Sequence, residues 1–457
     1  MVLHPCRNRN TEMTSAAAEP LDRRRDTPTA AALAAVRADS MPGEMAMVAL
    51  LFGPVDPPFT GVHIAGVDLI ERQVRQVRQA GAARVFVLGG RRRYDSNTAN
   101  LDNAAMLGPR LHDGDTVLVL SQGLVVDDRI IAAVMAAAGG ILSGGAIVAT
   151  WPAAAARRGV ERLDALTYAA GLAIYPAMLV RRMAMPLGDW DLHSTLLRAA
   201  LGEAACVRVD LTRLSVEAGQ IAEAEKQQAP LTYTLVDTPE AADRATAAVL
   251  ATTSRTRSDA PGRLLYPVIE QALLQMLAST RVSPQACVAL ASAIGLAAAL
   301  AFGVGWLWTA LALAILFGPL QHIGERLAEA RVIRLRWRQW RGFVIVIGYG
   351  WWLALAARLV LERGNGGPLA VAALLLLAQV TQLSELRVVR QGEMAAQPLG
   401  AQDRRIALWA AGRDSLALLL IPFALAGLWY AGLIALAGYA VVSAAAVHAR
   451  FLQRVRR

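Results

Sequence analysis

The sequence predicts an α/β Rossmann-like domain followed by an all-α bundle of six membrane-spanning helices. Hydrophobic residues make up 55% of the 457 residues, which is too apolar for an ordinary soluble protein. Between residues 45 and 245, short apolar runs alternate with amphipathic ones, as in the units of a parallel α/β sheet. After Pro284, apolar segments follow one another, each near the roughly 20 residues that span a bilayer.

The first 44 residues are rich in Ala, Arg, Asp, Thr and Pro, and they contain no apolar core of a secretory signal. We therefore expect a disordered leader over residues 1–44. The cysteines Cys6, Cys206 and Cys287 lie far apart and form no CxxC pair. Neither a disulfide framework nor a zinc site is expected, and the spacing fits a reducing cytoplasmic setting.

Within residues 45–245 the periodicity predicts strands and helices in alternation. Each predicted strand is a short run of β-branched or apolar residues, and each predicted helix spaces its apolar residues by three and four. The strands are 45–53, 83–90, 115–123 and 145–150, and the helices are 66–81 and 126–140. Asp127 and Asp128 lie at the start of the second helix, where negative charge is favourable.

Residues 246–285 are predicted to be a linker that contains a juxtamembrane amphipathic helix. The stretch "GRLLYPVIEQALLQMLAST" spaces its apolar residues at three and four. This pattern suits a helix that lies along the membrane surface, and it equally suits one that packs on a neighbouring helix.

Residues 286–457 are predicted to form the six-span membrane domain. The spans are approximately 286–303, 306–323, 343–361, 368–383, 408–427 and 429–449. Arginines fill the second and fourth connections and the C-terminal tail, whereas the first and fifth connections, "GVGW" and "GLWYAG", contain none. By the positive-inside rule, this alternation places both termini in the cytoplasm.

The net charge of +10 is almost entirely arginine, because Lys226 is the only lysine. Most of this charge follows the membrane topology, and no basic face interleaved with aromatic residues occurs in the first half of the chain. We therefore expect no nucleic-acid partner.

The order of α/β domain, amphipathic helix and bundle resembles the CDP-alcohol phosphatidyltransferase family. More narrowly, it is similar to bacterial fusions of a sugar- or inositol-phosphate nucleotidyltransferase to that membrane enzyme. The family's first helix typically begins Pro-Asn-x-x-Thr, and here Pro284, Gln285 and Val288 take the Pro, Asn and Thr places. "AAGRDSLALLLIPFALAG", around 412–414, also resembles the fifth helix of such fusions. The resemblance implies a multi-pass bacterial inner-membrane protein, a homodimer and membrane lipids as partners.

The resemblance also implies where metal ions would bind. Family members carry DxxDGxxAR at the end of the second helix and GxxxDxxxD on the third, and these aspartates hold divalent metal ions against a pyrophosphate. In this sequence Phe317, Leu320, Val346 and Gly350 stand at the four aspartate places, and no aspartate occurs between residues 287 and 402. The motif is degenerate, so Mg or Mn is expected only if the protein is active, and no other cofactor is expected.

The α/β domain departs from its resembling family in the same way. Such nucleotidyltransferases begin with a strand and a loop of the form LAAGxGxRL, whose backbone amides hold a triphosphate. Here Gly53 is an isolated glycine after the first strand, and no lysine precedes Lys226. The place of a metal-binding aspartate after the third strand is Gln122 or Gly123.

His322, Glu325 and Glu329 are candidates for a substitute metal site. Their spacing of i, i+3 and i+7 places them on one face of a helix, and His with two carboxylates suits Zn or Mn. The alternative is that they form the solvated end of the second span, kinked by Pro319.

Arg326, Arg331 and Arg334 are candidates for binding a lipid phosphate or a CDP-like anion, because guanidinium groups match phosphate geometry. The alternative is that they serve only the positive-inside topology.

Three functional hypotheses follow. The first is a non-catalytic protein that binds a nucleotide, a lipid or an active partner in phospholipid synthesis. The second is an active transferase that moves a phospho-alcohol from a CDP-alcohol to a lipid or polyol acceptor. The third is a small-molecule transporter or flippase, although no inverted-repeat pattern appears in the sequence.

Overall fold

The structure is a computed structural model. It describes residues 46–53, 61–90, 92, 94–138, 145–152, 161–185, 191–202, 206–211, 231–253, 266–278, 280, 282–333, 337–391 and 409–455. The predicted leader, 1–44, lies outside the described residues. The chain divides into two compact units, Met1–Glu217 with Leu231–Ala245 and Ala218–Pro230 with Thr246–Arg457. We call them the α/β unit and the helical unit.

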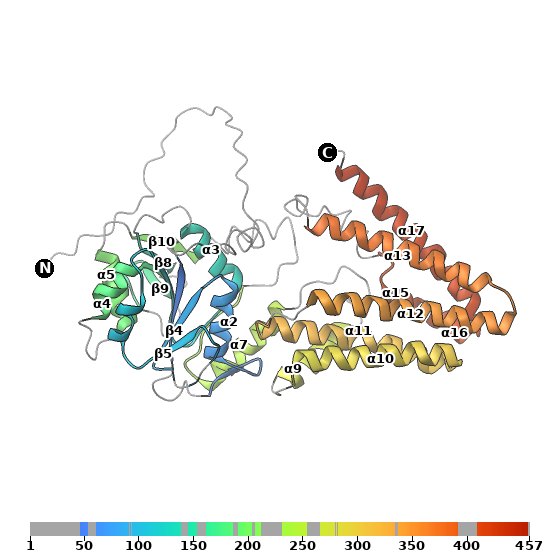
Figure 1. Ribbon diagram of the computed structural model, residues 1–457, viewed down its shortest axis with the longest axis horizontal. Coiled ribbons are helices and arrows are strands. Elements are labelled where there is room, and N and C mark those ends of the chain that lie inside the picture. The colour runs from blue at the N-terminus through green and yellow to red at the C-terminus, as the bar shows by residue number, and fades with distance from the viewer. Residues whose placement is uncertain are drawn as a thin grey trace, which may run out of the picture. The chain divides into compact units, whose positions relative to one another are not determined.

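A mixed sheet forms the centre of the α/β unit (Figure 1). In the described part of the chain it contains seven strands in the order β10-β8-β9-β6-β1-β4-β5. The strands are β1 (Met47–Phe52), β4 (Arg84–Leu88), β5 (Thr98–Leu101), β6 (Thr116–Leu120), β8 (Ile147–Pro152), β9 (Thr167–Pro176) and β10 (Val207–Asp210). All neighbouring pairs are parallel except those of β9, which is antiparallel to both β6 and β8.

The four predicted strands are confirmed as β1, β4, β6 and β8, and their burial explains the sequence signal. Every residue of β1 is buried, as expected for a strand covered on both faces. Strands β5, β9 and β10 were not predicted from the sequence. The mixed pairing is therefore a correction to the expected parallel sheet.

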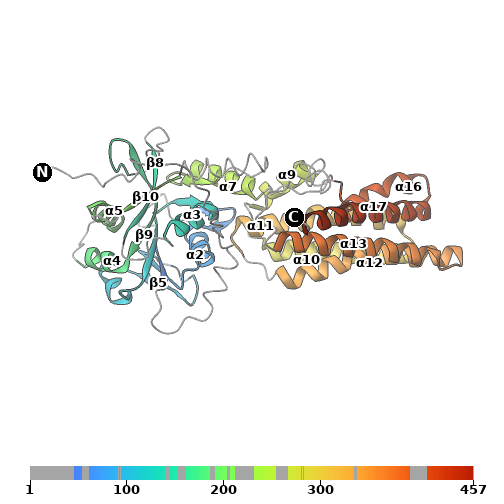
Figure 2. The same cartoon turned by 90° about the horizontal axis from the view of Figure 1, so that it is seen from above.

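Helices cover both faces of the sheet, as both views show (Figures 1 and 2). Helices α2 (Leu69–Gln79) and α3 (Asp128–Ala138) lie on one face, and α4 (Ala177–Ala184) and α5 (Leu192–Gly202) lie on the other. Each face has its own apolar core. Asp68 caps α2, because its carboxylate accepts hydrogen bonds from the backbone N–H groups of Ile70 and Glu71.

Smaller elements complete the α/β unit. Two short antiparallel pairs flank the main sheet, and two 3-10 turns precede β6. These elements are β2 (His63–Ile64), β3 (Val67–Asp68), η1 (Ala104–Met106), η2 (Gly108–Arg110), β7 (Leu124–Val126) and β11 (Tyr233–Leu235). Helix α7 (Pro239–Thr252) follows and crosses the division between the units.

The helical unit consists of long helices and two short ones. Its helices are α9 (Tyr266–Ala278), α10 (Pro284–Val304), α11 (Leu307–Ala330), α12 (Trp337–Arg363), α13 (Gly367–Gln391), α15 (Arg413–Leu419), α16 (Ile421–Leu425) and α17 (Trp429–Val455). Among the described residues, four helices are long and apolar enough to cross a membrane, namely α10, α11, Gly367–Glu385 of α13 and Trp429–Gln453 of α17.

The predicted fifth span is not one helix. Residues 408–427 hold α15 and α16, and the two together are shorter than any of the four long spans. Pro422 lies at the start of α16, where its missing N–H interrupts the helical hydrogen-bond ladder. The count of six spans stays a prediction, because the structure supports four.

The long helices pack into one bundle with a continuous apolar core. Helix α10 packs against α11 and α12, α12 packs against α13, and α13 packs against α17. The Trp351 indole N–H donates to the carbonyl of Gly295 at 2.8 Å, and the Trp351 ring meets Phe317 edge to face at 5.2 Å. The amphipathic helix α9 packs on α11, in agreement with the second of the two readings of its pattern.

Candidate functional site

The four positions predicted to correspond to metal-binding aspartates do not converge on one pocket. Phe317 is fully buried, and Leu320 packs partly buried against the same core. Val346 on α12 is 66% exposed, so it points away from that core. A side chain at Gly350 would meet no atom within 4 Å. The inward face of α12 instead carries Ile347, Trp351 and their neighbours.

An arginine from a distant part of the sequence lies over Phe317. The guanidinium carbon of Arg413, at the start of α15, lies 4.4 Å from the Phe317 ring centroid and 5.8 Å from that of Trp351. Such cation–π contacts contribute about 0.5–2 kcal/mol. A Cβ at Gly348 would overlap the Arg413 side chain, so glycine at this position leaves the room that Arg413 occupies.

Arg413 forms hydrogen bonds with its neighbour Asp414 and with Gln321 of helix α11. Asp414 Oδ1 accepts a hydrogen bond from Arg413 Nε at 3.0 Å, and Arg413 Nη2 donates to Gln321 Oε1 at 3.0 Å. The side chain of Asp414 is only 7% exposed. A Cβ at Gly318 would lie 2.6 Å from Asp414 Oδ2, so α11 also leaves space for this ion pair.

His322 lies between two carboxylates. Its Nδ1 is 3.7 Å from Glu325 Oε2, and its Nε2 is 3.7 Å from Asp414 Oδ2. Gln321 Nε2 donates to Glu325 Oε1 at 2.8 Å. We call Gln321, His322, Glu325, Arg413 and Asp414 the polar cluster. Distances of 3.7 Å are too long for hydrogen bonds.

Of the three predicted metal ligands, His322 and Glu325 belong to the polar cluster. Glu329 is exposed, although the sequence places it on the same helical face as His322 and Glu325. Across the described residues, no group of three or more His, Cys, Asp or Glu side chains is arranged to hold a metal. The polar cluster instead contains a fixed guanidinium, which can bind the oxygens of a phosphate.

The other candidate arginines have structural partners. Arg326 pairs with Glu270 of α9 at 3.2 Å, and both side chains are largely buried. Arg331 is 4% exposed and donates to the carbonyls of Leu277, in the last turn of α9, and Thr280, just after that helix. Both arginines therefore hold α9 against α11. Arg334 lies outside the described residues.

Sequence reasoning did not identify Arg413 and Asp414 as partners of the second span. The only available signal was the phrase "GRD" directly before an apolar run. An adjacent Arg-Asp pair inside a membrane segment is costly unless it has partners. That cost is the physical reason to look for a site there.

The α/β unit presents a second candidate site at the carboxyl ends of its parallel strands, where open α/β sheets bind ligands. A Cβ at Gly53 would lie 2.8 Å from the backbone of Gly89 and Gly90. Glycine is therefore required after β1 for close packing of two strand ends. At the same edge, Asn100 Oδ1 and Ser121 Oγ are buried and have no hydrogen-bond partner in the described part of the chain.

Asp127 does not lie at that edge, because it follows β7 and directly precedes α3. It accepts a hydrogen bond from the backbone N–H of Arg129 at 2.9 Å, and its carboxylate pairs with the Arg129 side chain at 2.7 Å. Burial alone would raise the pKa of Asp127, but the hydrogen bonds from Arg129 outweigh it and lower the pKa below its usual value.

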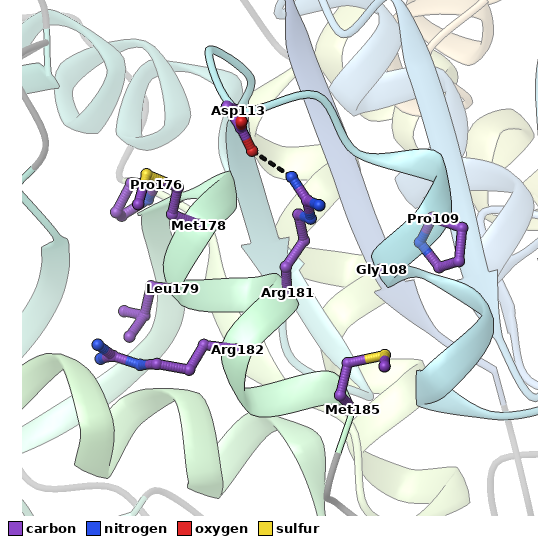
Figure 3. A pocket seen from close by; sticks show the side chains of 9 residues that line it. All are labelled: Gly108, Pro109, Asp113, Pro176, Met178, Leu179, Arg181, Arg182 and Met185. Atoms are coloured by element: carbon purple, nitrogen blue, oxygen red, sulfur yellow. Dashed lines mark hydrogen bonds and ion pairs between the residues drawn. The ribbon is translucent and has the colours of Figure 1, made fainter.

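A pocket of about 700 Å³ opens at the opposite edge of the sheet (Figure 3). Pro176 ends β9 there, and it pairs with Thr116 at the amino end of β6. Arg181 and Asp113 form an ion pair across the pocket mouth, and Met178 and Met185 of the same region are exposed. Because it lies at the amino ends of the parallel strands, this pocket is separate from the carboxyl edge.

No protein-family model matches the chain, and no curated protein matches it. The solved structures that are similar to part of it include the three that follow. A 4-diphosphocytidyl-2C-methyl-D-erythritol synthase from Anaerococcus prevotii DSM 20548 is 9% identical, with 44% of this chain and 95% of that chain covered and a TM-score of 0.32. Another 4-diphosphocytidyl-2C-methyl-D-erythritol synthase is 14% identical, with 36% and 90% covered and a TM-score of 0.28.

The third is a CMP:2-keto-3-deoxy-manno-octonic acid synthetase in complex with CTP. It is 12% identical, with 39% of this chain and 99% of that chain covered and a TM-score of 0.27. Similarity at these TM-scores and identities does not assign a function to this chain.

Proposed function

We propose that this chain is a non-catalytic membrane protein of phospholipid synthesis that binds a phosphate-bearing ligand, such as a CDP-alcohol, at the polar cluster. The observation that carries the proposal is Arg413, which lies over the buried Phe317 at 4.4 Å. A fixed guanidinium therefore stands beside a position where the resembling family has a metal-binding aspartate.

The geometry of Arg413 supports phosphate binding rather than metal-dependent transfer. Asp414 accepts from its Nε at 3.0 Å and Gln321 accepts from its Nη2 at 3.0 Å, and these two bonds hold the guanidinium group in place. Apolar residues at the motif positions supply no metal-binding oxygens. A phosphate can bind Arg413 without metal through charge-assisted hydrogen bonds.

We propose a bacterial-type inner membrane, cytoplasmic termini, bound membrane lipids and a homodimer. A nucleotide ligand at the carboxyl edge of the sheet is supported by the unpartnered buried atoms of Asn100 and Ser121.

The test uses the full chain in lipid nanodiscs. With Mg²⁺ or Mn²⁺ present, we expect no CMP release from CDP-diacylglycerol. With EDTA present, radiolabelled CDP-diacylglycerol should still bind, and Arg413→Gln should weaken binding about tenfold, which is the loss of about 1.4 kcal/mol.

Arg358→Gln is the matched control for charge. Arg358 lies near the C-terminal end of α12, where it pairs with Glu362 at 2.9 Å, so its loss should leave binding unchanged. Metal-dependent CMP release by the wild-type chain would overturn the non-catalytic proposal. Equal loss of binding in Arg413→Gln and Arg358→Gln would show that Arg413 is not part of the binding site.

A second candidate function, an active phosphotransferase, is favoured by the position of His322. An imidazole held between two carboxylates can accept the proton of an attacking hydroxyl. In that case CMP release from a CDP-alcohol should depend on an added lipid or polyol acceptor. It should also be lost in His322→Gln and persist in Arg358→Gln.

A further inference from the structure

The stretch that precedes α15 is held by side chains of two other helices. Tyr439 of α17 donates its hydroxyl hydrogen to the carbonyl of Trp409 at 2.5 Å. The backbone N–H of Ala411 donates to Ser443 Oγ of α17 at 2.9 Å. Gln379 Nε2 of α13 lies 3.4 Å from the Ala411 carbonyl. Both backbone polar groups of Ala411 are thus bound by side chains.

The Ser443 hydroxyl group both accepts and donates a hydrogen bond. It accepts from Ala411 and donates to Gln382 Oε1 at 3.0 Å. All three residues are buried, with 3% exposure for Ala411, 4% for Gln382 and 8% for Ser443. Inside an apolar bundle, a backbone N–H without a partner raises the free energy of the folded chain. The two hydrogen bonds of Ser443 therefore fix the position of the backbone at Ala411.

The position of the backbone at Ala411 determines the position of Arg413, the first residue of α15. Gly412 is the N-cap residue of α15 and provides no side-chain hydrogen bond to the helix. The bonds at Ala411 therefore replace the usual anchor of a helix start. From there Arg413 extends away from α13 and α17 to Gln321 and Phe317 on α11.

We propose that Ser443 and Gln382 are positioning residues, which hold the backbone at Ala411 so that Arg413 is set for phosphate binding. This inference rests on the proposed function of the polar cluster. Ser443 and Gln382 act through the backbone and are not themselves expected to touch the ligand.

The test is Ser443→Ala in the full chain in nanodiscs. Because the variant frees the Ala411 N–H, binding of CDP-diacylglycerol in EDTA should weaken about tenfold. Ser443→Thr retains the hydroxyl and should restore binding. Ser292→Ala is the matched control, since Ser292 is also buried but bonds to the Val288 carbonyl of its own helix at 2.8 Å. Its binding should equal that of the wild type.

A second measurement reports the position of Arg413 without any ligand. The rate at which phenylglyoxal modifies Arg413, followed by mass spectrometry, should rise several-fold in Ser443→Ala and stay unchanged in Ser292→Ala. Gln382→Leu should raise it in the same direction, which provides a second variant if Ser443→Ala does not fold.

The two readouts separate the two proposals. Faster modification in a chain whose wild type binds no CDP-diacylglycerol would support the positioning role and refute phosphate binding. An unchanged modification rate in Ser443→Ala and Gln382→Leu would overturn the positioning role, whatever happens to binding.

Discussion

Asp127 shows how a single carboxylate is held at the start of a helix. Its backbone and side chain form hydrogen bonds at the first turn of α3, and Arg129 completes the ion pair. Burial acts to raise the pKa of Asp127, and the bonds from Arg129 lower it further than burial raises it. A lowered pKa means that the ionised group stabilises the folded α/β unit above the unfolded value of 3.8.

We predict that Asp127→Asn destabilises α3 by about 1 kcal/mol at neutral pH, because the ion pair with Arg129 is lost while the amide oxygen can still cap the helix. The difference from the wild type should vanish as the pH falls below 3.8 and through the folded pKa. Hydrogen exchange of the α3 amides, corrected for intrinsic exchange rates, measures this difference in stability between the variant and the wild type. The exposed Asp102→Asn is the control, and a difference that persists in acid would contradict the assignment.

Other residue roles could be predicted only where both partners lie on one helix. The contact between His322 and Glu325 follows from their i, i+3 spacing. Arg326 and Arg331 could not be assigned in this way, because their partners, Glu270 and Thr280, lie about fifty residues earlier. Arg413 is separated from Gln321 by more than ninety residues.

At the scale of elements, α12 and α15 meet through a glycine. We predict that Gly348→Ala destabilises the helical unit by about 1–3 kcal/mol, because the added methyl group overlaps the Arg413 side chain. Gly350→Ala on the same helix meets no atom within 4 Å and should be neutral or slightly stabilising. Thermal unfolding in detergent compares the two. Equal melting temperatures would show that Arg413 is not packed there.

Elements with a strong periodic pattern were predictable, and elements defined by their neighbours were not. Strands β1 and β6 are continuous apolar runs, so their type is clear from sequence. Strand β9, "TYAAGLAIYP", is rich in Ala and Gly and lacks that signal. Its antiparallel direction depends on pairing with β8, the preceding strand, and with β6, which lies farther back in the chain.

At the scale of the whole molecule, the number of spans decides which side of the membrane each connection faces. Six spans with cytoplasmic termini place Asn365, between α12 and α13, on the non-cytoplasmic side of the membrane. If only α10, α11, α13 and α17 cross the membrane, Asn365 stays in the cytoplasm.

We predict that Asn365→Cys, in a chain whose native cysteines are replaced, reacts with a membrane-impermeant maleimide on intact cells. Gln453→Cys, near the C-terminus, should react only after lysis. Labelling of both residues only after lysis would favour four spans over six. Labelling of Gln453→Cys on intact cells would contradict the cytoplasmic C-terminus.

By itself, the sequence determined that an α/β part precedes a helical membrane part, because hydrophobic periodicity and segment length are local properties. It also showed that no aspartate occurs between residues 287 and 402. Only the tertiary structure decided which groups meet near the motif positions. Arg413 and Asp414 reach α11 because Gly318 and Gly348 leave room and because Ser443 holds the preceding backbone. Such contacts join residues far apart in the chain, so no local pattern encodes them.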